Sequence, residues 1–122
     1  SLTPDVIHCN DWQAALVPAL LSQFDTHPAS VFTIHNLAYM GLFDKQIFFE
    51  LGLPAELWTF DGVEFHDLFS FIKGALSYAD CIITLDLGHI TECGTHRQLM
   101  ELNDYYAQTY RLQEIEEDLD AA

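Results

Sequence analysis

The first third of the chain alternates two apolar runs with one helical pattern. Residues 5–9 and 30–34 are short apolar runs of the kind that forms β-strands. Between them, apolar residues from 12 to about 23 recur at steps of three and four, which predicts a helix with one face toward a core. A strand–helix–strand order predicts that the two strands are parallel neighbours joined by a right-handed crossover.

Short polar residues and a proline modify that helix. Asn10 or Asp11 is expected to cap its start, because a short side-chain oxygen can accept hydrogen bonds from free backbone N–H groups. Pro18 lies inside the predicted span and is expected to bend it. We therefore expect a capped helix with a kink.

The middle of the chain shows less regular periodicity. Residues 37–68 are irregular and rich in aromatic side chains, and Asp61-Gly62 is a turn signal. A loop this long in a small domain usually has a function or covers another part of the protein. A helix is predicted over residues 69–78, and a buried strand over residues 80–85.

Turn and cap signals follow one another in the last third. The run Asp86-Leu87-Gly88-His89 predicts a tight hairpin turn between two apolar strands, the second of which ends at Gly94. Thr95 is expected to cap the next helix and Asn103 to close it. Residues 104–122 predict a final helix to about 116, followed by either a frayed acidic tail or a solvated helix end.

The elements together predict one small α/β domain over residues 1–122. It has about three parallel strands, a carboxy-terminal β-hairpin and flanking helices. The length of 122 residues suits a single domain, and an apolar fraction of 50% is typical of a globular protein.

Acidic residues dominate the charge. The net charge is −15, from 4 basic and 19 acidic residues. A field of this sign repels phosphate backbones, so no nucleic-acid partner is expected. It also hinders binding of a nucleotide-sugar unless cations gather at the site. Outside histidine, the chain offers only Lys45, Lys73, Arg97 and Arg111.

The sequence indicates no membrane span, no disulfide framework and no metal site. No apolar run approaches the roughly 18 residues of a membrane span, and no basic start with an apolar signal segment is present. We therefore expect a cytoplasmic chain without membrane insertion. The cysteines Cys9, Cys81 and Cys93 form no disulfide framework and are expected to be apolar filler in a reducing compartment. Cys93 and His96 have the spacing of half a zinc site, but no second pair accompanies them, so no metal is predicted.

Five separated elements of the first 80 residues form one ordered set. They are Val6-Ile7-His8-Cys9-Asn10-Asp11-Trp12, Thr33-Ile34-His35-Asn36-Leu37-Ala38-Tyr39, Leu51-Gly52-Leu53-Pro54, Gly62-Val63-Glu64-Phe65, and Phe71-Ile72-Lys73-Gly74-Ala75 leading to Tyr78-Ala79-Asp80. In this order they resemble the glycogen and starch synthases, glycosyltransferases that use ADP-glucose. The resemblance covers about residues 4–80. It implies a partial Rossmann-like sheet from the amino-terminal domain of a GT-B fold, whose active site lies in a cleft between two such domains.

The resemblance also implies roles for five residues. His35 sits in the donor-sugar pocket and assists the departure of ADP, since an imidazole beside a leaving group can donate a hydrogen bond that strengthens as charge develops. Asn36 lines the same pocket. Asp11 and Trp12 lie near the site, although capping and core packing account for them equally well. Tyr39 contributes a hydroxyl or packs within its loop. Without the resemblance, a histidine at the end of a strand is more often structural.

Beyond residue 80 the chain resembles a different family. Residues 83–96 carry Leu-Asp-x-Gly-x-Ile and Glu-x-Gly-Thr-His, in the order found at the end of the nucleotide-binding domain of ABC exporters. The similarity continues to about residue 116. We therefore predict a chimera, natural or made, in which a synthase-like segment (1–79) joins an ABC ATPase tail-like segment (80–122) near Ala79-Asp80.

Neither segment contains the complete site of its family. The ABC-like segment lacks a phosphate loop, so ATP hydrolysis is not expected. The synthase-like segment lacks the second domain, which supplies groups for the diphosphate in that family. We therefore expect a synthase-type fragment without cofactor and without catalytic competence alone; ADP-glucose and glucan are the partners of the full-length family. The alternative is a non-catalytic chimeric fold or interaction module that forms homo-oligomers through open sheet edges.

Overall fold

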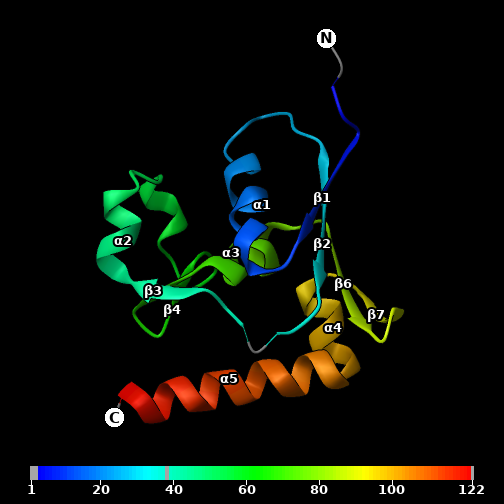
Figure 1. The fold of residues 1–122 in the computed structure, drawn as a ribbon. Coiled ribbons are helices and arrows are strands. Elements are labelled where there is room, and N and C mark those ends of the chain that lie inside the picture. The colour runs from blue at the N-terminus through cyan, green and yellow to red at the C-terminus, as the bar shows by residue number, and fades with distance from the viewer. Residues whose placement is uncertain (1–2, 38, 122) are drawn as a thin grey trace.

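Four strands form the main sheet of the structure (Figure 1). The computed structural model describes residues 3–37 and 39–121. In sheet order the strands are β1 (Val6–Asn10), β2 (Ala29–Ile34), β6 (Cys81–Asp86) and β7 (His89–Gly94). The first three are parallel, and β7 returns antiparallel to β6. The predicted α/β class, with three parallel strands and a carboxy-terminal hairpin, is confirmed.

One face of this sheet carries the main core. Phe32 of β2 lies in register with Ile82 of β6, and both side chains are fully buried. The helices α1 (Leu16–Leu21) and α3 (Phe71–Tyr78) pack against each other beside the sheet (Figure 1). Ile72 of α3 belongs to the same buried cluster as the two strand residues. Alternate strand residues therefore build this core, as the apolar runs predict.

The segment after β1 departs from the predicted single helix of residues 12–23. It forms a 3₁₀ turn, η1 (Trp12–Ala14), followed by the short helix α1. Pro18 accounts for the division, because a residue without an N–H fits the first turn of an α-helix, where no intrahelical partner is needed. The capping prediction was wrong: Asn10 ends β1, and Asp11 makes no side-chain cap hydrogen bond. The Asp11 carboxylate binds across to the loop after β2 instead.

Residues 37–68 contain regular structure that the sequence pattern did not predict. A second, antiparallel sheet has the order β3 (Leu42–Asp44), β5 (Leu68–Ser70), β4 (Glu64–Phe65), accompanied by α2 (Lys45–Glu50) and the 3₁₀ turn η2 (Ala55–Leu57). Strands of two or three residues are too short to show alternation. Because β5 takes residues 68–70, α3 begins at Phe71 and not at residue 69. Ser70 caps α3 by accepting the Lys73 backbone N–H at 3.3 Å.

The aromatic residues of this middle region form a second core. Phe48 and Phe69 are fully buried, with ring centroids 5.5 Å apart and planes at 85°. The ring centroid of Trp58 lies 5.1 Å from that of Phe48, with the ring planes at 49°. Such edge-to-face and tilted pairs stabilise a core beyond the area they bury. The aromatic segment therefore packs on itself around its own small sheet.

The turn and cap signals of the last third are confirmed. Leu87 (φ 49°) and the glycine after it (φ 78°) make the tight turn between β6 and β7. Thr95 forms a capping box at the start of α4 (His96–Leu102), and Asn103 closes this helix in the left-handed conformation. The final helix, α5 (Tyr105–Ala121), is longer than predicted, so the acidic end is helical.

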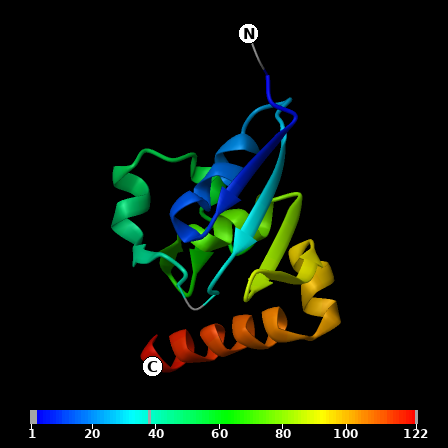
Figure 2. The ribbon, with the colours of Figure 1, turned by 45° about the vertical axis from the view of Figure 1, so that its right-hand side comes forward.

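The two predicted segments, 1–79 and 80–122, share one core. Leu99 of α4 and Tyr106 of α5 are fully buried in the cluster that contains Phe32. α5 runs past the carboxyl ends of β1 and β2 in both views (Figures 1 and 2). None of the helices in the described part of the chain is long and apolar enough to cross a membrane.

Two hydrogen bonds join the predicted junction near Ala79-Asp80 to the neighbouring strand β2. The Ser30 N–H donates to Asp80 Oδ2 at 2.8 Å, and the Asp80 N–H donates to the Ser30 carbonyl at 3.0 Å. Asp80 thereby ties the start of β6 to the start of β2. This pairing fixes where the last strand of the parallel set begins.

Candidate functional site

The five residues singled out from the sequence line one pocket of about 270 Å³. The pocket lies where β1 and β2 end, and its walls come from the loops that follow these parallel strands. This edge of a parallel sheet is where α/β proteins commonly bind ligands. Its lining residues are Asp11, Trp12, Gln13, His35, Asn36 and Tyr39. Gln13 is the one lining residue that sequence reasoning missed, since nothing in its local pattern distinguishes it. We call this space the His35 pocket.

Asp11 holds the two strand ends together. Its backbone N–H donates to the Thr33 carbonyl at 3.0 Å, and its Oδ1 accepts the His35 backbone N–H at 3.0 Å. Its Oδ2 lies 4.0 Å from His35 Nε2. The Asp11 backbone has φ 63° and ψ 173°, a region that is strained for every residue except glycine. Asp11 therefore positions the main chain at His35 and places a carboxylate beside the imidazole.

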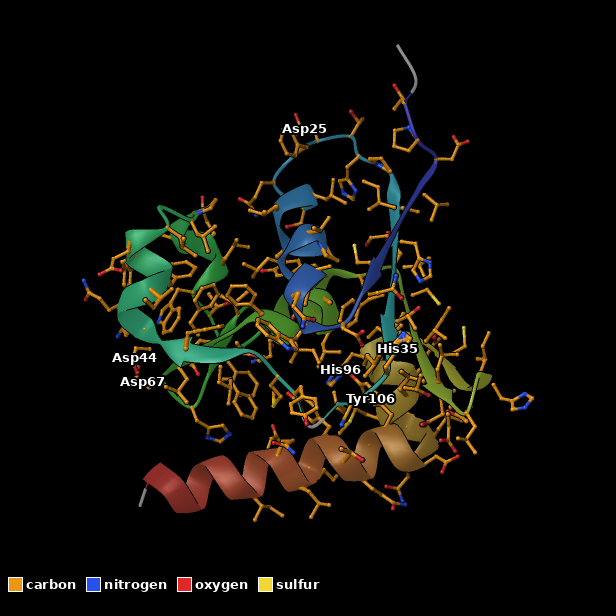
Figure 3. The ribbon with its side chains drawn as sticks, in the orientation of Figure 1. Asp25, His35, Asp44, Asp67, His96 and Tyr106 are labelled. Carbon is orange, nitrogen blue, oxygen red and sulfur yellow. The ribbon has the colours of Figure 1, made fainter. Side chains whose placement is uncertain are left out.

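The His35 ring remains accessible. Its side chain is 50% exposed, and that of Asp11 is 39% exposed. Figure 3 shows His35 near the end of β2, on the side of the sheet where α5 passes. An exposed imidazole at this place can donate to or accept from a ligand.

Trp12 forms an aromatic wall of the pocket. Its ring centroid lies 6.0 Å from that of Phe43 and 5.8 Å from that of Phe71. Gly41 (φ 63°) passes directly over the indole, and a Cβ built there would lie 2.4 Å from Trp12 Cε3. The Gly41 carbonyl accepts the Phe71 N–H at 3.1 Å, which fastens the loop after β2 to the start of α3. Trp12 thus both lines the pocket and packs in the core.

The loop after His35 presents Tyr39 to solvent. Tyr39 is 66% exposed, and its N–H donates to the Asn36 carbonyl at 3.3 Å. Ala38, which belongs to the synthase-like motif, lies outside the described residues. Tyr39 is therefore not a packed aromatic residue, and its hydroxyl can reach a ligand in the pocket.

A second pocket of about 360 Å³ also has His35 among its lining residues. Its remaining lining residues come from the last third of the chain and are Leu85, Asp86, Thr91, Glu92 and Asp104. Glu92 is 5% exposed, and its Oε2 accepts the Tyr106 N–H at 2.9 Å. Within the described part of the chain, Glu92 Oε1 is buried without a hydrogen-bond partner. Sequence reasoning missed these neighbours because they lie far from His35 in the chain.

The four lysine and arginine side chains are engaged away from the His35 pocket. Neither pocket that touches His35 has a lysine or arginine among its lining residues in the described part of the chain. The Lys45 ammonium lies 3.6 Å from Asp67 Oδ1, and Arg97 Nε lies 3.1 Å from Glu101 Oε1. The Arg111 guanidinium donates to Asn103 Oδ1, and the Lys73 side chain is buried. The surroundings of His35 are therefore acidic, and a diphosphate would meet no cationic partner there.

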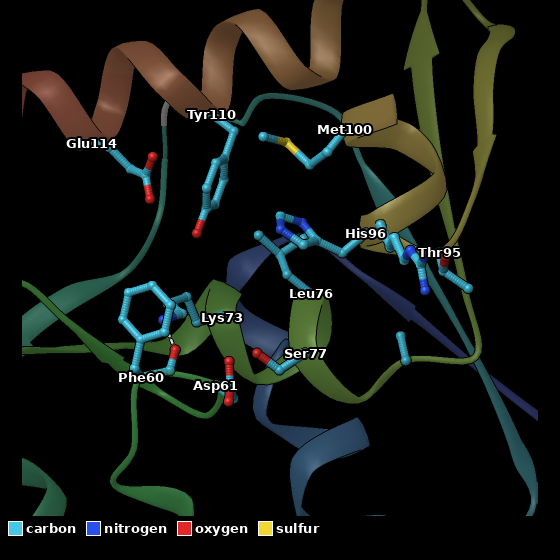
Figure 4. Close-up of a pocket in the computed structure, with 12 residues that line it drawn as sticks. Phe60, Asp61, Lys73, Leu76, Ser77, Thr95, His96, Met100, Tyr110 and Glu114 are labelled. Carbon is cyan, nitrogen blue, oxygen red and sulfur yellow. Dashed lines mark hydrogen bonds between the residues drawn. The ribbon is translucent and has the colours of Figure 1, made fainter. Parts of the chain in front are cut away.

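A larger pocket of about 550 Å³ lies between α3, α4 and α5 (Figure 4). It contains none of the residues predicted from the sequence. The Lys73 ammonium donates to the backbone carbonyls of Phe60 and, at 2.7 Å, of Glu64. His96 Nδ1 lies 2.6 Å from the Tyr106 hydroxyl. Its central polar groups thus hold the fold together, and we assign it no chemistry.

Burial controls the ionisation of the groups around this larger pocket. It lowers the pKa of Lys73, against the opposing effect of Glu64 and other carboxylates. Burial, and then the charge of Lys73, lowers the pKa of His96. Burial, with the charge of Glu114, raises the pKa of Tyr110 to about 12. Neutral His96 and Tyr110 are therefore the favoured forms near neutral pH.

The cysteines differ in their surroundings. Cys9 is buried in the main core, as apolar filler is expected to be. Cys81 is half-buried and Cys93 exposed, so the filler interpretation is wrong for these two. Among the described residues, no group of three or more His, Cys, Asp or Glu side chains is placed to hold a metal ion.

Comparison with known proteins identifies close relatives over most of the chain. The sequence model of a family described as the starch synthase catalytic domain matches residues 1–108. The glycogen synthase of Thioalkalivibrio sulfidiphilus is 53% identical over 95 residues, which cover 78% of this chain and 20% of that protein. The glycogen synthase of Marinobacter nauticus is 50% identical over 92 residues, covering 75% of this chain and 19% of that protein. The chain thus spans about a fifth of the length of these curated relatives.

A solved structure agrees with the sequence comparisons. The catalytic domain of starch synthase IV from Arabidopsis thaliana, bound to ADP and acarbose, has a TM-score of 0.59 and 29% identity, covering 66% of this chain and 18% of that chain. The family match runs past residue 80 to residue 108, through much of the segment with the predicted exporter resemblance. The exporter origin of that segment therefore stays a prediction.

Proposed function

Because the chain belongs to the starch synthase catalytic domain family, we propose that it carries one wall of a glucosyl-donor site, with His35 beside the departing group. The remaining family-type residues of the same pocket are Asp11, Trp12, Asn36 and Tyr39. ADP-glucose and a glucan are the proposed donor and acceptor of the full-length protein. The observation that carries this proposal is the convergence of all five residues on one pocket at the carboxyl ends of β1 and β2.

The proposed role of His35 is hydrogen-bond donation. An imidazole N–H aimed at a sugar hydroxyl or a phosphate oxygen stabilises the negative charge that develops as the glucosyl bond breaks. Asp11 acts as a positioning residue, because its carboxylate accepts the His35 backbone N–H at 3.0 Å. Trp12 supports the wall against which the sugar would lie. The chain thus supplies orientation and one donor.

We further propose that this chain alone does not turn over ADP-glucose. A diphosphate leaving group needs cations or oriented donors where its charge develops, and such electrostatic stabilisation commonly contributes most of the rate enhancement. No lysine or arginine lines the two described pockets at His35, whereas Asp86, Glu92 and Asp104 do line one of them. The missing groups are proposed to come from the part of the relatives that this chain does not span.

Ligand-observed NMR tests the proposed donor wall. Saturation transfer from the protein to the glucosyl protons of ADP-glucose is expected to be weak. It is expected to vanish in His35→Ala and to persist in the matched control His27→Ala, since His27 is an exposed residue outside the His35 pocket. Added salt should strengthen binding, because it screens the repulsion between the diphosphate and the acidic chain. Equal signals from both variants would rule out His35 as a binding residue.

A second candidate is a non-catalytic interaction module that forms homo-oligomers. The sheet order favours it, because β1 and β7 are the outer strands of the main sheet and open edges can pair with another chain. In this proposal the exporter-like tail joins the synthase-like segment near Ala79-Asp80 and serves only as a structural cover. Size-exclusion chromatography with light scattering tests it, and a monomer at all accessible concentrations would count against it.

A further inference from the structure

Two thiols face each other across the β6–β7 hairpin. Cys81 Sγ lies 3.4 Å from Cys93 Sγ. The third cysteine, Cys9, is buried on β1 and belongs to the main core. The Cys81–Cys93 pair is therefore a separate cluster of reactive side chains, and neither cysteine lines a pocket that contains His35.

The strand register explains the closeness of the two sulfur atoms. Ile83 lies opposite Cys93, so Cys81 is the diagonal neighbour of Cys93 on the same face of the hairpin. Ile82 between them in the register points to the opposite, buried face. Since β7 is an outer strand of the sheet, the sulfur atoms can approach to the roughly 2.0 Å of a disulfide by side-chain rotation and a small shift of that strand.

We propose that Cys81 and Cys93 are a reversible redox-modification site that forms an intramolecular disulfide with a small-molecule disulfide such as oxidised glutathione. The Cys93 thiolate attacks one sulfur of the oxidant, forming a mixed disulfide and releasing one glutathione thiolate. Cys81 then attacks Cys93 Sγ and releases the second glutathione. Two protein thiols are oxidised, one glutathione disulfide is reduced to two thiols, and two protons leave the protein.

The order of the two steps follows from exposure. Cys93 is exposed, so the oxidant reaches its sulfur directly. Cys81 is half-buried, and burial together with its hydrogen bond to Cys93 raises the pKa of its thiol. Cys81 is therefore the poorer first nucleophile, and its position 3.4 Å from Cys93 suits it to resolve the mixed disulfide.

The disulfide would restrain the outer strand next to the acidic pocket. β7 carries Thr91 and Glu92, which line the pocket beside His35. Closing the hairpin covalently removes conformational freedom from the unfolded chain and raises the melting temperature. This inference does not depend on the proposed glucosyl-donor function, because it rests on the two sulfur atoms and the strand register alone.

Mass spectrometry of the whole chain in glutathione redox buffers provides the test. Wild type and the control Cys9→Ala are expected to lose two hydrogens without gaining glutathione, to yield a proteolytic peptide pair linked through Cys81 and Cys93, and to melt several degrees higher than when reduced. Cys81→Ser is expected to stop with one glutathionyl group on Cys93. Cys93→Ser is expected to react several-fold more slowly.

Three results would overturn the inference. The first is a wild-type chain that carries separate glutathionyl groups on Cys81 and Cys93 without an internal link. The second is a link between two chains in place of the internal one. The third is a wild-type chain whose three thiols all stay reduced in oxidised glutathione. Peptide mapping of the wild-type protein distinguishes these results even if a variant fails to fold.

Discussion

A methyl group at Gly41 should distort the wall of the His35 pocket. Gly41 has φ 63°, and a Cβ there would lie 2.4 Å from Trp12 Cε3, 3.0 Å from Trp12 Cδ2 and 3.1 Å from Phe71 Cβ. Contacts this short to a packed indole require the ring or the loop to move. Because the Gly41 carbonyl is bonded to the Phe71 N–H, the loop has little room to yield.

Two costs add up in Gly41→Ala. An L-residue in the left-handed region costs roughly 1–2 kcal/mol relative to glycine. Overpacking a filled site costs roughly 1–3 kcal/mol more. We therefore expect the free energy of unfolding to fall by roughly 2–5 kcal/mol. Gly52 is the matched control, since it has φ 68° with no atom within 4 Å of the built Cβ, so that Gly52→Ala should lose only the roughly 1–2 kcal/mol of backbone strain.

Urea denaturation followed by tryptophan fluorescence measures both effects. The chain has 2 tryptophans, so a Trp58→Phe background makes Trp12 the single reporter for both glycine variants. Gly41→Ala should lower the midpoint more than Gly52→Ala and shift the native emission of Trp12, whereas Gly52→Ala should leave that emission unchanged. Equal loss of stability in the two variants, with unchanged Trp12 emission, would show that the indole does not resist the added methyl group.

Individual contacts elsewhere in the fold give three more expected outcomes. Asp11→Ala should lower the free energy of unfolding by about 1–3 kcal/mol, because the His35 backbone N–H loses its acceptor. Asp11→Asn keeps an acceptor and should lose less, and a reversed order in urea denaturation would speak against this role of the carboxylate. Since the pKa of His96 is lower in the folded chain than its ordinary 6.5, the unfolded chain binds more protons below that pH; stability should be full above about pH 6.5 and decline as pH falls below it. His96→Gln should flatten this decline in melts at a series of pH values, and an unchanged slope would exclude His96 as its source. Thr95→Ala removes the capping box of α4 and should lower the free energy of unfolding, measured by urea denaturation, by about 1 kcal/mol. Thr95→Ser keeps a hydroxyl acceptor and should retain most of this stability.

Local signals predicted the last third of the chain better than its middle. Thr95 and Asn103 act through contacts with residues three or four positions away, so a short stretch of sequence contains both partners of each contact. The three-residue strand β3 depends on a partner that is remote in the chain, because Leu42 lies opposite Ser70. A short window of residues around β3 therefore does not contain the partner that makes it a strand, and the neighbouring strands β4 and β5 are too short to show alternation.

Asp11 illustrates how a tertiary contact can replace a local one. Its short carboxylate before a helical pattern is a typical cap signal, yet the side chain binds the His35 N–H across the sheet edge. The same contact brings the predicted site residues together. The resemblance to a known family therefore located the pocket, whereas propensity alone would have given Asp11 a different partner.

The acidic neighbours of His35 could not be foreseen from the sequence. Glu92 lies on β7, which pairs beside β6, and Asp104 lies in the turn between α4 and α5, so that only the fold brings both to the pocket that contains His35. The position of these two residues matters for ligand binding, because carboxylates beside His35 repel a diphosphate. The net charge of −15 predicted that the chain repels a diphosphate, but only the fold shows that carboxylates lie close to His35.

Transfer of radiolabelled glucose from ADP-glucose to glycogen by the purified chain is the decisive test of whether one wall of the donor site can act alone. We predict incorporation no greater than that of His35→Ala, because the described lining of the proposed donor wall contains no lysine or arginine that could bind the diphosphate. Incorporation that clearly exceeds this background and disappears in His35→Ala would prove the prediction wrong, since a single wall would then be a working transferase.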